Sequence, residues 1–138
     1  MAMHPIGPDI LNTIAAWPPS AQQHLLSARA IAFETAETAS TGPLSESLKW
    51  GQPAWRPSRP RTGSTLRLNW SPDWPGQLLA YVDCKTDLAS QMSTRFPQQF
   101  GNDGRRSLAF DLDVPLPQDA IAQLAHLTFT YHRQKLSR

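Results

Sequence analysis

A stretch in the middle of the chain combines positive charge with indole rings and has no carboxylate. From Lys49 to Trp70 there are five basic side chains and no Asp or Glu, although the net charge of the whole chain is only +2. The remaining residues together therefore carry a net charge of −3. The cations are Lys49, Arg56, Arg59, Arg61 and Arg67, and the same stretch holds Trp50, Trp55 and Trp70, with Trp74 just beyond it.

These residue types suit the recognition of anions. A guanidinium offers a fork of N–H donors that matches carboxylate or phosphate, and an indole face stacks on a flat ligand or on arginine. We therefore expect a surface that binds a small anionic molecule or the acidic patch of a partner protein. Its expected members are Lys49, Trp50, Trp55 and Arg67, joined by Arg105 if the fold brings the two basic loops together. The structural alternative is that Trp50 and Trp70 are core residues and that arginine stems cover them.

A nucleic-acid surface is disfavoured by the small number of charges. If all five cations met duplex phosphates, log K would fall with log salt at a slope of about −4.5. That slope removes roughly two to three decades of affinity between about 50 and 200 mM salt. Only weak, non-specific binding is left, so we predict no tight duplex binding at physiological salt.

The tripeptide Lys49-Trp50-Gly51 marks the end of a predicted strand. Gly51 and Pro53 indicate a fixed bend, because glycine adopts backbone geometry that other residues resist. Lys49 alternates with Leu48 and Trp50, so it points to the opposite face of the strand if those two point inward. A buried lysine is a nucleophile or base in some enzymes. No carbonyl-binding partner is identifiable here, so the sequence favours a lysine that contacts an anion or is structurally paired, and no catalytic residue is assigned.

Asp111 and Asp113 are the clearest pair of carboxylates. They lie two residues apart on the last predicted strand and therefore share a face, opposite Phe110 and Leu112. Such a pair could hold a metal ion or act as acid and base, but a hard cation needs further oxygen ligands, and solvated strand residues are the alternative. The four histidines have no zinc-ligand spacing. Cys84 is expected to be a small core residue.

The composition is typical of one folded domain. With 138 residues, 40% of them hydrophobic, the chain buries about two-thirds of its extended surface on folding, which is enough for a core without staples. A single cysteine cannot form an internal disulfide, no secretory signal is recognised, and the longest strongly apolar run, at 78–82, is too short for a membrane helix. We expect a cytoplasmic protein, a monomer or small homo-oligomer, with no membrane partner and no cofactor.

Helical patterns occupy the beginning, the middle and the end of the chain. The residues Ser20 to Gln23 fit a capping box that opens the longest helix. Arg29 falls inside the apolar stripe of that helix, so its side chain either extends to solvent or pairs with an acidic residue. The predicted helices run from Asp9 to near Trp17, from Ser20 to about Thr38, from about Thr86 to before Pro97, and from Pro117 to the end.

Strand patterns of period two fill most of the remaining chain. They run over 45–50, 65–70, 77–83 and 107–112, and Pro53 to Arg56 is an uncertain edge. The segment 71–76 is dense in turn formers, so the strands on either side of it are expected to pair as a hairpin. Because hairpin-type links dominate, the predicted fold class is α+β. We expect a single two-layer domain in which helices pack on an antiparallel sheet of four to five strands.

The segment Leu48 to Trp55 resembles the Lys-Trp-Gly-x-Pro-x-aromatic signature of the YdhG-like domains, a bacterial family of largely unknown function. The second half of the chain is also similar to that family's closing pattern. There Gly104 to Phe110 provides a glycine, basic residues and a strand, and Pro115-Leu116-Pro117 precedes the final helix. The resemblance runs from Ile10 to about Arg133. It implies one YdhG-like α+β domain over residues 1–138, with a core at about 8–134.

The same resemblance implies an alternative function. Some YdhG-like domains have been linked to intracellular iron handling, with similarity to frataxins, so an iron-binding or carrier protein is the second expectation. The carboxylates it would use are Glu34, Glu37, Asp111 and Asp113, with Glu46 beyond the helix. Three glutamates form a thin acidic ridge, so a binding domain for an anion remains the favoured function.

Overall fold

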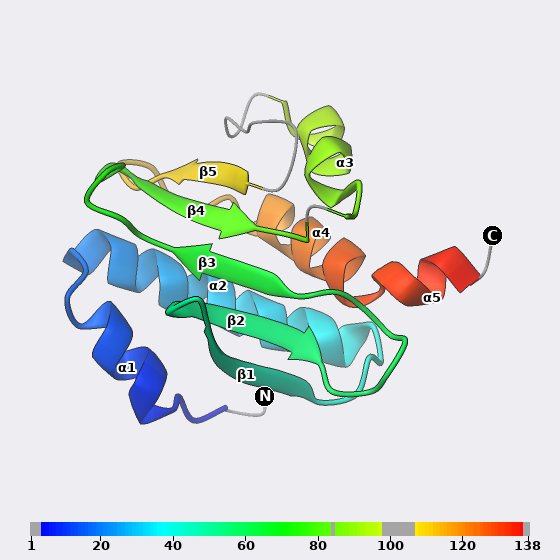
Figure 1. Ribbon diagram of the computed structural model, residues 1–138. Helices are drawn as coiled ribbons and strands as arrows, with labels where there is room; N and C mark the ends of the chain where they lie inside the picture. The colour runs from blue at the N-terminus through cyan, green and yellow to red at the C-terminus, as the bar shows by residue number, and fades with distance from the viewer. Residues whose placement is uncertain (1–3, 84, 98–106, 137–138) are drawn as a thin grey trace.

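The computed structural model describes residues 4–83, 85–97 and 107–136, and these form one α+β domain (Figure 1). In chain order the elements are α1 (Pro8–Ile14), α2 (Pro19–Thr38), β1 (Leu44–Lys49), β2 (Gln52–Pro57), β3 (Leu66–Asn69), β4 (Gln77–Tyr81), α3 (Leu88–Arg95), β5 (Ser107–Asp111), α4 (Gln118–Phe129) and α5 (Tyr131–Leu136). In the described part of the chain, no helix is both long enough and apolar enough to span a bilayer.

The five strands form one antiparallel sheet in the order β1-β2-β3-β4-β5. The predicted fold class and the predicted hairpin between β3 and β4 are confirmed. The segment expected as an uncertain edge, Pro53 to Arg56, lies inside the sheet as part of β2, and β1 forms the edge. β2 accommodates its prolines because Pro53 and Pro57 lie opposite Leu48 and Leu44, at positions that donate no hydrogen bond to β1.

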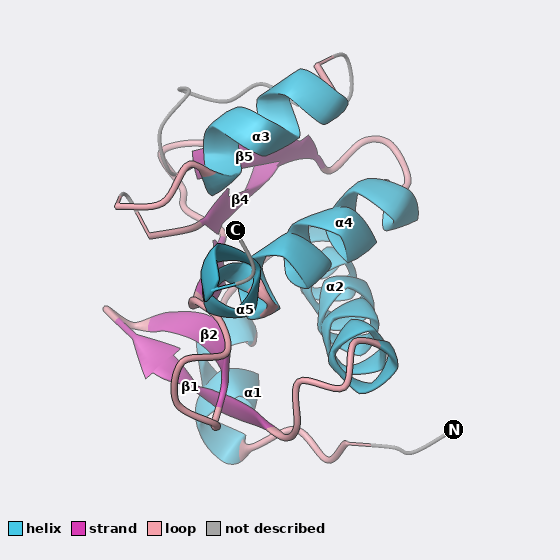
Figure 2. Cartoon of the chain, turned by 90° about the vertical axis from the view of Figure 1, so that its right-hand side faces the viewer, coloured by secondary structure: helices cyan, strands magenta, loops and turns pink. Residues whose placement is uncertain are grey.

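Among the described elements, the helices α2 and α4 both cover the same face of the sheet, and neither covers the other face. Figure 2 shows the sheet nearly edge-on with both helices on the same side. Alternate strand residues point to these helices and form the core, where each is at most 1% exposed. They are Trp55, Leu66, Leu68, Leu78, Ala80, Leu108 and Phe110, and the buried Val82 continues the pattern just after β4. The opposite face is the one that Figure 1 turns towards the viewer, and we call it the open face.

Two predicted helix boundaries are wrong. The capping box at Ser20 does not form, because the helix begins one residue earlier with Pro19, whose missing N–H costs nothing in the first turn. The predicted final helix is divided at Thr130 into α4 and α5. The carbonyl of Thr62 accepts hydrogen bonds from the backbone N–H groups of His132 and Arg133, so the β2–β3 loop holds the chain where the two helices meet.

The same loop passes very close to the end of α4 at Gly63. A Cβ added there would lie 2.1 Å from the carbonyl oxygen of Phe129, which is a backbone atom with no freedom to rotate away. The neighbouring residue Ser64 donates its N–H to the carbonyl of Thr128 at 2.8 Å. Gly63 is therefore needed for close approach of two backbones and not for an unusual φ.

We predict that Gly63→Ala destabilises the protein by about 2 kcal/mol or more, because the loop must move away from α4. Chemical denaturation monitored by far-UV circular dichroism measures this change. Gly76→Ala is the matched control, since a Cβ there meets nothing within 4 Å, and it should change stability by less than about 0.5 kcal/mol. Equal stability of the two variants would contradict the close approach.

Candidate functional site

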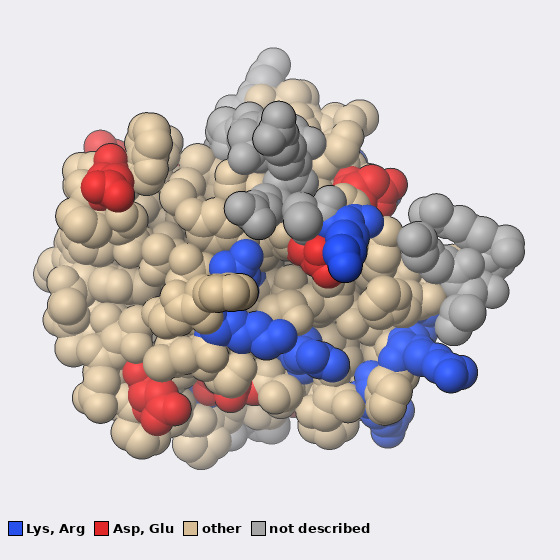
Figure 3. All heavy atoms as spheres, in the orientation of Figure 1, with Lys and Arg blue, Asp and Glu red and all other residues tan. Residues whose placement is uncertain are grey.

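The open face carries basic side chains from three adjacent strands. Lys49, Arg56 and Arg67 lie on it because each alternates with neighbours that point to the core side of the sheet. Figure 3 shows Lys and Arg side chains gathered over β2 and β3 in the middle of this face. The only acidic residue in β1 to β4 is Glu46, and it lies on the other face. The sequence-based placement of Arg67 opposite Leu66 and Leu68 is confirmed.

The Arg67 side chain is positioned by two neighbours on the open face. Its Nη1 atom donates a hydrogen bond to Oε1 of Gln52 at 2.8 Å, and its guanidinium carbon lies 5.1 Å from the centre of the Tyr81 ring. Arg67 and Tyr81 are direct cross-strand partners. Sequence reasoning did not include Gln52 or Tyr81 in the site. The alternation of Tyr81 with the buried Ala80 and Val82 is the signal that places it on this face.

The exposed Trp50 lies at the tip of the β1–β2 hairpin. Lys49 pairs with Gln52, so Trp50 and Gly51 form a two-residue turn with φ values of 56° and 74°. Positive φ at both positions is what a type I′ turn requires. The strand ends at Lys49, so the alternation that would direct Trp50 inward with Leu48 stops before it. Trp50 is 89% exposed, and the structural alternative that made it a core residue is wrong.

Trp55 lies on the core face of the sheet. Its side chain is fully buried, and Nε1 donates a hydrogen bond to Oε2 of Glu46 at 2.6 Å. The expectation that it lines the same surface as the cations is wrong, because its position between Ala54 and Arg56 directs it to the opposite side of β2. Of the five cations of the central stretch, Lys49, Arg56 and Arg67 therefore share a face. Arg59 lies elsewhere, beside His4 and Gly42, Arg61 is in the β2–β3 loop, and Trp55 does not join the cations of the open face.

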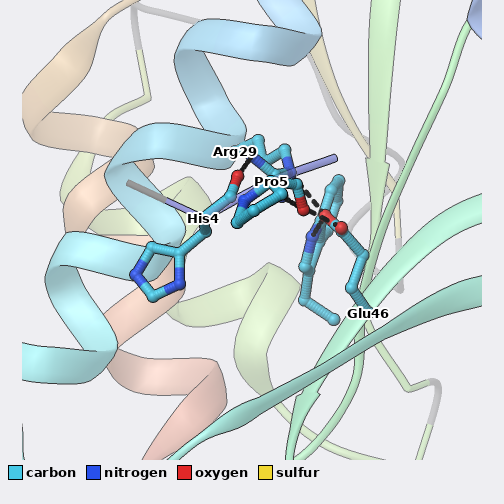
Figure 4. Close-up of polar contacts among 5 residues, drawn as sticks. His4, Pro5, Arg29 and Glu46 are labelled. Atoms are coloured by element: carbon cyan, nitrogen blue, oxygen red, sulfur yellow. Dashed lines mark hydrogen bonds and ion pairs between the residues drawn. The ribbon is translucent and has the colours of Figure 1, made fainter. Parts of the chain in front are cut away.

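Beneath Trp55, the carboxylate of Glu46 forms an ion pair with Arg29 of α2. The Nε and Nη2 atoms of Arg29 donate to the two carboxylate oxygens at 2.6 and 3.0 Å. Its Nη1 and Nη2 atoms also donate to the carbonyl oxygens of His4 and Pro5, at 2.8 and 3.1 Å (Figure 4). Both charged side chains are nearly buried. Of the two predictions for Arg29, pairing with an acidic residue is confirmed.

The carboxylates considered for a metal are dispersed. Asp111 is the last residue of β5, and its Oδ1 accepts a hydrogen bond from the N–H of Asp113, so Asp113 belongs to a turn and not to the strand. Glu34 lines a hollow of about 690 Å³ between α2 and α4, whereas Glu37 lines a separate hollow of about 410 Å³ beside His4. Among the described residues, no three His, Cys, Asp or Glu side chains are grouped so that they could hold a metal ion.

Two residues named from the sequence lie outside the part of the chain that the structure describes. They are Arg105, the conditional member of the anion site, and Cys84, expected in the core. Trp70, the other indole of the central stretch, is half-buried at the end of β3 and donates its N–H to the carbonyl of Pro75. The candidate site therefore consists of Lys49, Gln52, Arg56, Arg67 and Tyr81 on the open face, with Trp50 at its end.

Comparisons with known proteins do not add to this assignment. No protein-family model matches the chain, and searches of curated proteins and of solved structures find no significant match. The YdhG-like resemblance therefore stays a prediction from the motifs.

We predict that Glu46→Ala destabilises the protein by about 3–5 kcal/mol, because it leaves the nearly buried Arg29 guanidinium without its counter-charge. Urea denaturation of the purified variant measures the change. Glu37→Ala is the control. Glu37 contacts His4 at 3.1 Å in an exposed position, and its loss should cost less than about 1 kcal/mol. A Glu46 variant as stable as the Glu37 variant would show that the ion pair contributes little to the fold.

Proposed function

We propose that this protein is a non-enzymatic binding domain whose open face recognises an anionic molecule or the acidic surface of a partner protein. The observation that carries the proposal is the charge of that face. Lys49, Arg56 and Arg67 come from three adjacent strands, and no carboxylate from β1 to β4 lies among them. A cationic patch of this kind attracts anionic partners and raises their rate of association.

The spacing of the cations supports a ligand with more than one negative charge. Neighbouring strands are about 4.8 Å apart, and residues two apart along a strand are about 6.7 Å apart. Arg56 and Arg67 are diagonal neighbours, and Lys49 lies one strand beyond on the other side of β2. With these spacings, the backbone positions of Arg56 and Arg67 are about 8 Å apart, and Lys49 lies about 12 Å from Arg67 and about 14 Å from Arg56. A patch of this length suits a ligand with several carboxylates or phosphates.

The scaffold supports recognition at this patch. The Arg67 guanidinium is oriented by Gln52 and by the Tyr81 ring, so less rotamer entropy is lost when it meets a ligand.

Duplex nucleic acid remains disfavoured, because three cations give a salt slope of only about −2.7. With a single cysteine in the chain, we place the protein in the cytoplasm as part of this proposal. Iron carriage remains the alternative, and titration of the protein with ferrous iron tests it.

We predict that NMR titrations will locate the ligand on the open face. The probes are ATP, citrate and an octaglutamate peptide, added to ¹⁵N-labelled protein at low salt. For at least one of them, shifts of backbone amides should cluster at Lys49, Gln52, Arg56, Arg67 and Tyr81, and added salt should weaken them.

Charge reversal provides the control for this titration. Arg56→Glu changes an exposed residue of the patch and should weaken binding by about tenfold. Arg95→Glu reverses a charge on the helical side, where Arg95 contacts Gln123 of α4, and should leave binding unchanged. Shifts confined to the hollow between α2 and α4, or equal effects of the two reversals, would overturn the proposal.

A further inference from the structure

Trp50 occupies a backbone position that is strained for tryptophan, and its exposed side chain adds no packing to the core. A residue other than glycine in the left-handed region is strained, and type I′ turns favour Asn, Asp or Gly at this place. Trp50 has a φ of 56° there, and its side chain is 89% exposed. Within the described residues its indole forms no hydrogen bond and no ring contact. Burial in the core therefore does not explain why a tryptophan stands at this turn.

We propose that Trp50 is the anchor with which this domain docks on a folded partner protein, by inserting its indole into an apolar pocket that has an acidic rim. This inference rests on the proposed function and names its partner. Trp50 projects from a hairpin tip, so a small anion bound on the open face would leave most of the indole in water. Only a macromolecule that supplies the pocket itself buries such a side chain, and buried tryptophans dominate the energy of many interfaces.

The residues beside Trp50 define the rim of that pocket. Lys49 precedes it on β1, and Arg67 and Arg56 continue the positive charge across the open face. Carboxylates around the pocket would meet these cations when the indole enters, which gives charge complementarity and fixes the orientation of the partner. The burial of the Trp50 indole then stabilises the complex, and the cations of the open face make an acidic partner surface bind better than a neutral or basic one.

A protein partner suits this end of the molecule better than a lipid bilayer. Trp74 and Val114, which are 61% and 50% exposed, lie in the β3–β4 and β5–α4 connections, at the same end of the sheet as the β1–β2 hairpin (Figure 1). A flat bilayer that bound this end of the molecule would contact all of these connections at the same time. The same end carries the carboxylates of Asp73 and Asp113 in these connections and of Asp111 at the end of β5, which an anionic lipid surface repels. A pocket that receives Trp50 alone avoids that repulsion.

The first experiment tests whether Trp50 is retained at the expense of stability. Trp50→Asn replaces it with the residue that the turn favours, and the midpoint of thermal unfolding should rise by about 2–5 °C. Trp50→Val is the matched control and should lower the midpoint, because a β-branched residue tolerates positive φ least. A midpoint lowered by Trp50→Asn would show that the indole stabilises the fold, and the inference would fail.

The second experiment identifies and measures the partner. Photo-crosslinking from benzoylphenylalanine at position 50, in the cells that produce the protein, should capture a protein that the same group at position 114 does not. Isothermal titration calorimetry with that purified partner should show affinity lowered at least about 30-fold by Trp50→Ala and by Trp50→Asn, and about tenfold by Lys49→Glu. Trp74→Ala should leave the affinity unchanged.

The variants separate this inference from the function on which it rests. If Arg56→Glu weakens binding of the partner and Trp50→Ala does not, the open face is the site and the anchor is refuted. If Trp50→Ala weakens binding and Arg56→Glu does not, the anchor stands and the proposed function of the open face fails. Absence of a position-specific crosslink overturns the inference. Binding of the protein to phosphatidylserine vesicles, lost in Trp50→Ala, overturns it in favour of a membrane.

Discussion

The ion pair between Arg29 and Glu46 joins parts of the protein that are far apart in the sequence. Arg29 belongs to α2 and Glu46 to the edge strand β1, and the guanidinium also binds the carbonyls of His4 and Pro5. The same carboxylate accepts the indole N–H of Trp55 on β2. One buried charge pair therefore connects the helical layer, two strands and the N-terminal segment. A nearly buried guanidinium is tolerated only because its donors are satisfied in this way.

This pair also shapes the surface on the other side of the sheet. Glu46 is the only acidic residue of β1 to β4, and the period of the strand directs it towards Arg29 and away from the open face. The cations of the open face consequently have no counter-charge from these four strands. The residue that neutralises Arg29 in the core is thus kept away from Lys49, Arg56 and Arg67 on the surface, and the proposed function depends on that separation of charge between the two faces.

The hairpin between β1 and β2 connects this patch to the exposed indole. Its register is set by the two-residue turn, which pairs Lys49 with Gln52 and places Pro53 and Pro57 at positions that donate nothing to β1. Gln52 in turn contacts Arg67. The turn that exposes Trp50 therefore also fixes the orientation of the central cation. This link makes the hairpin the structural unit of the candidate site.

Much of the fold was predictable, because alternation of period two and helical stripes depend on neighbours close in the sequence. Leu66, Leu68 and Arg67 were assigned to the correct faces of β3 in this way. Trp55 was not, and Trp50 was expected on the surface with the core as an alternative. Both are tryptophans in a basic stretch, and only the position of the turn decides that one is exposed and the other buried. The two contacts of Arg67, Gln52 and Tyr81, come from other strands, so the local pattern of β3 contains no sign of them.

The sequence by itself determined the fold class, the antiparallel pairing and the excess of positive charge in the central stretch, because each follows from composition or from periodicity within a single segment. The tertiary structure alone decided which charges are neutralised and which remain on the surface. Arg29 and Glu46 are 17 residues apart and belong to different layers, so their pairing depends on how α2 packs against the sheet. Packing between layers is a property of the whole chain, and for that reason no local pattern reveals it.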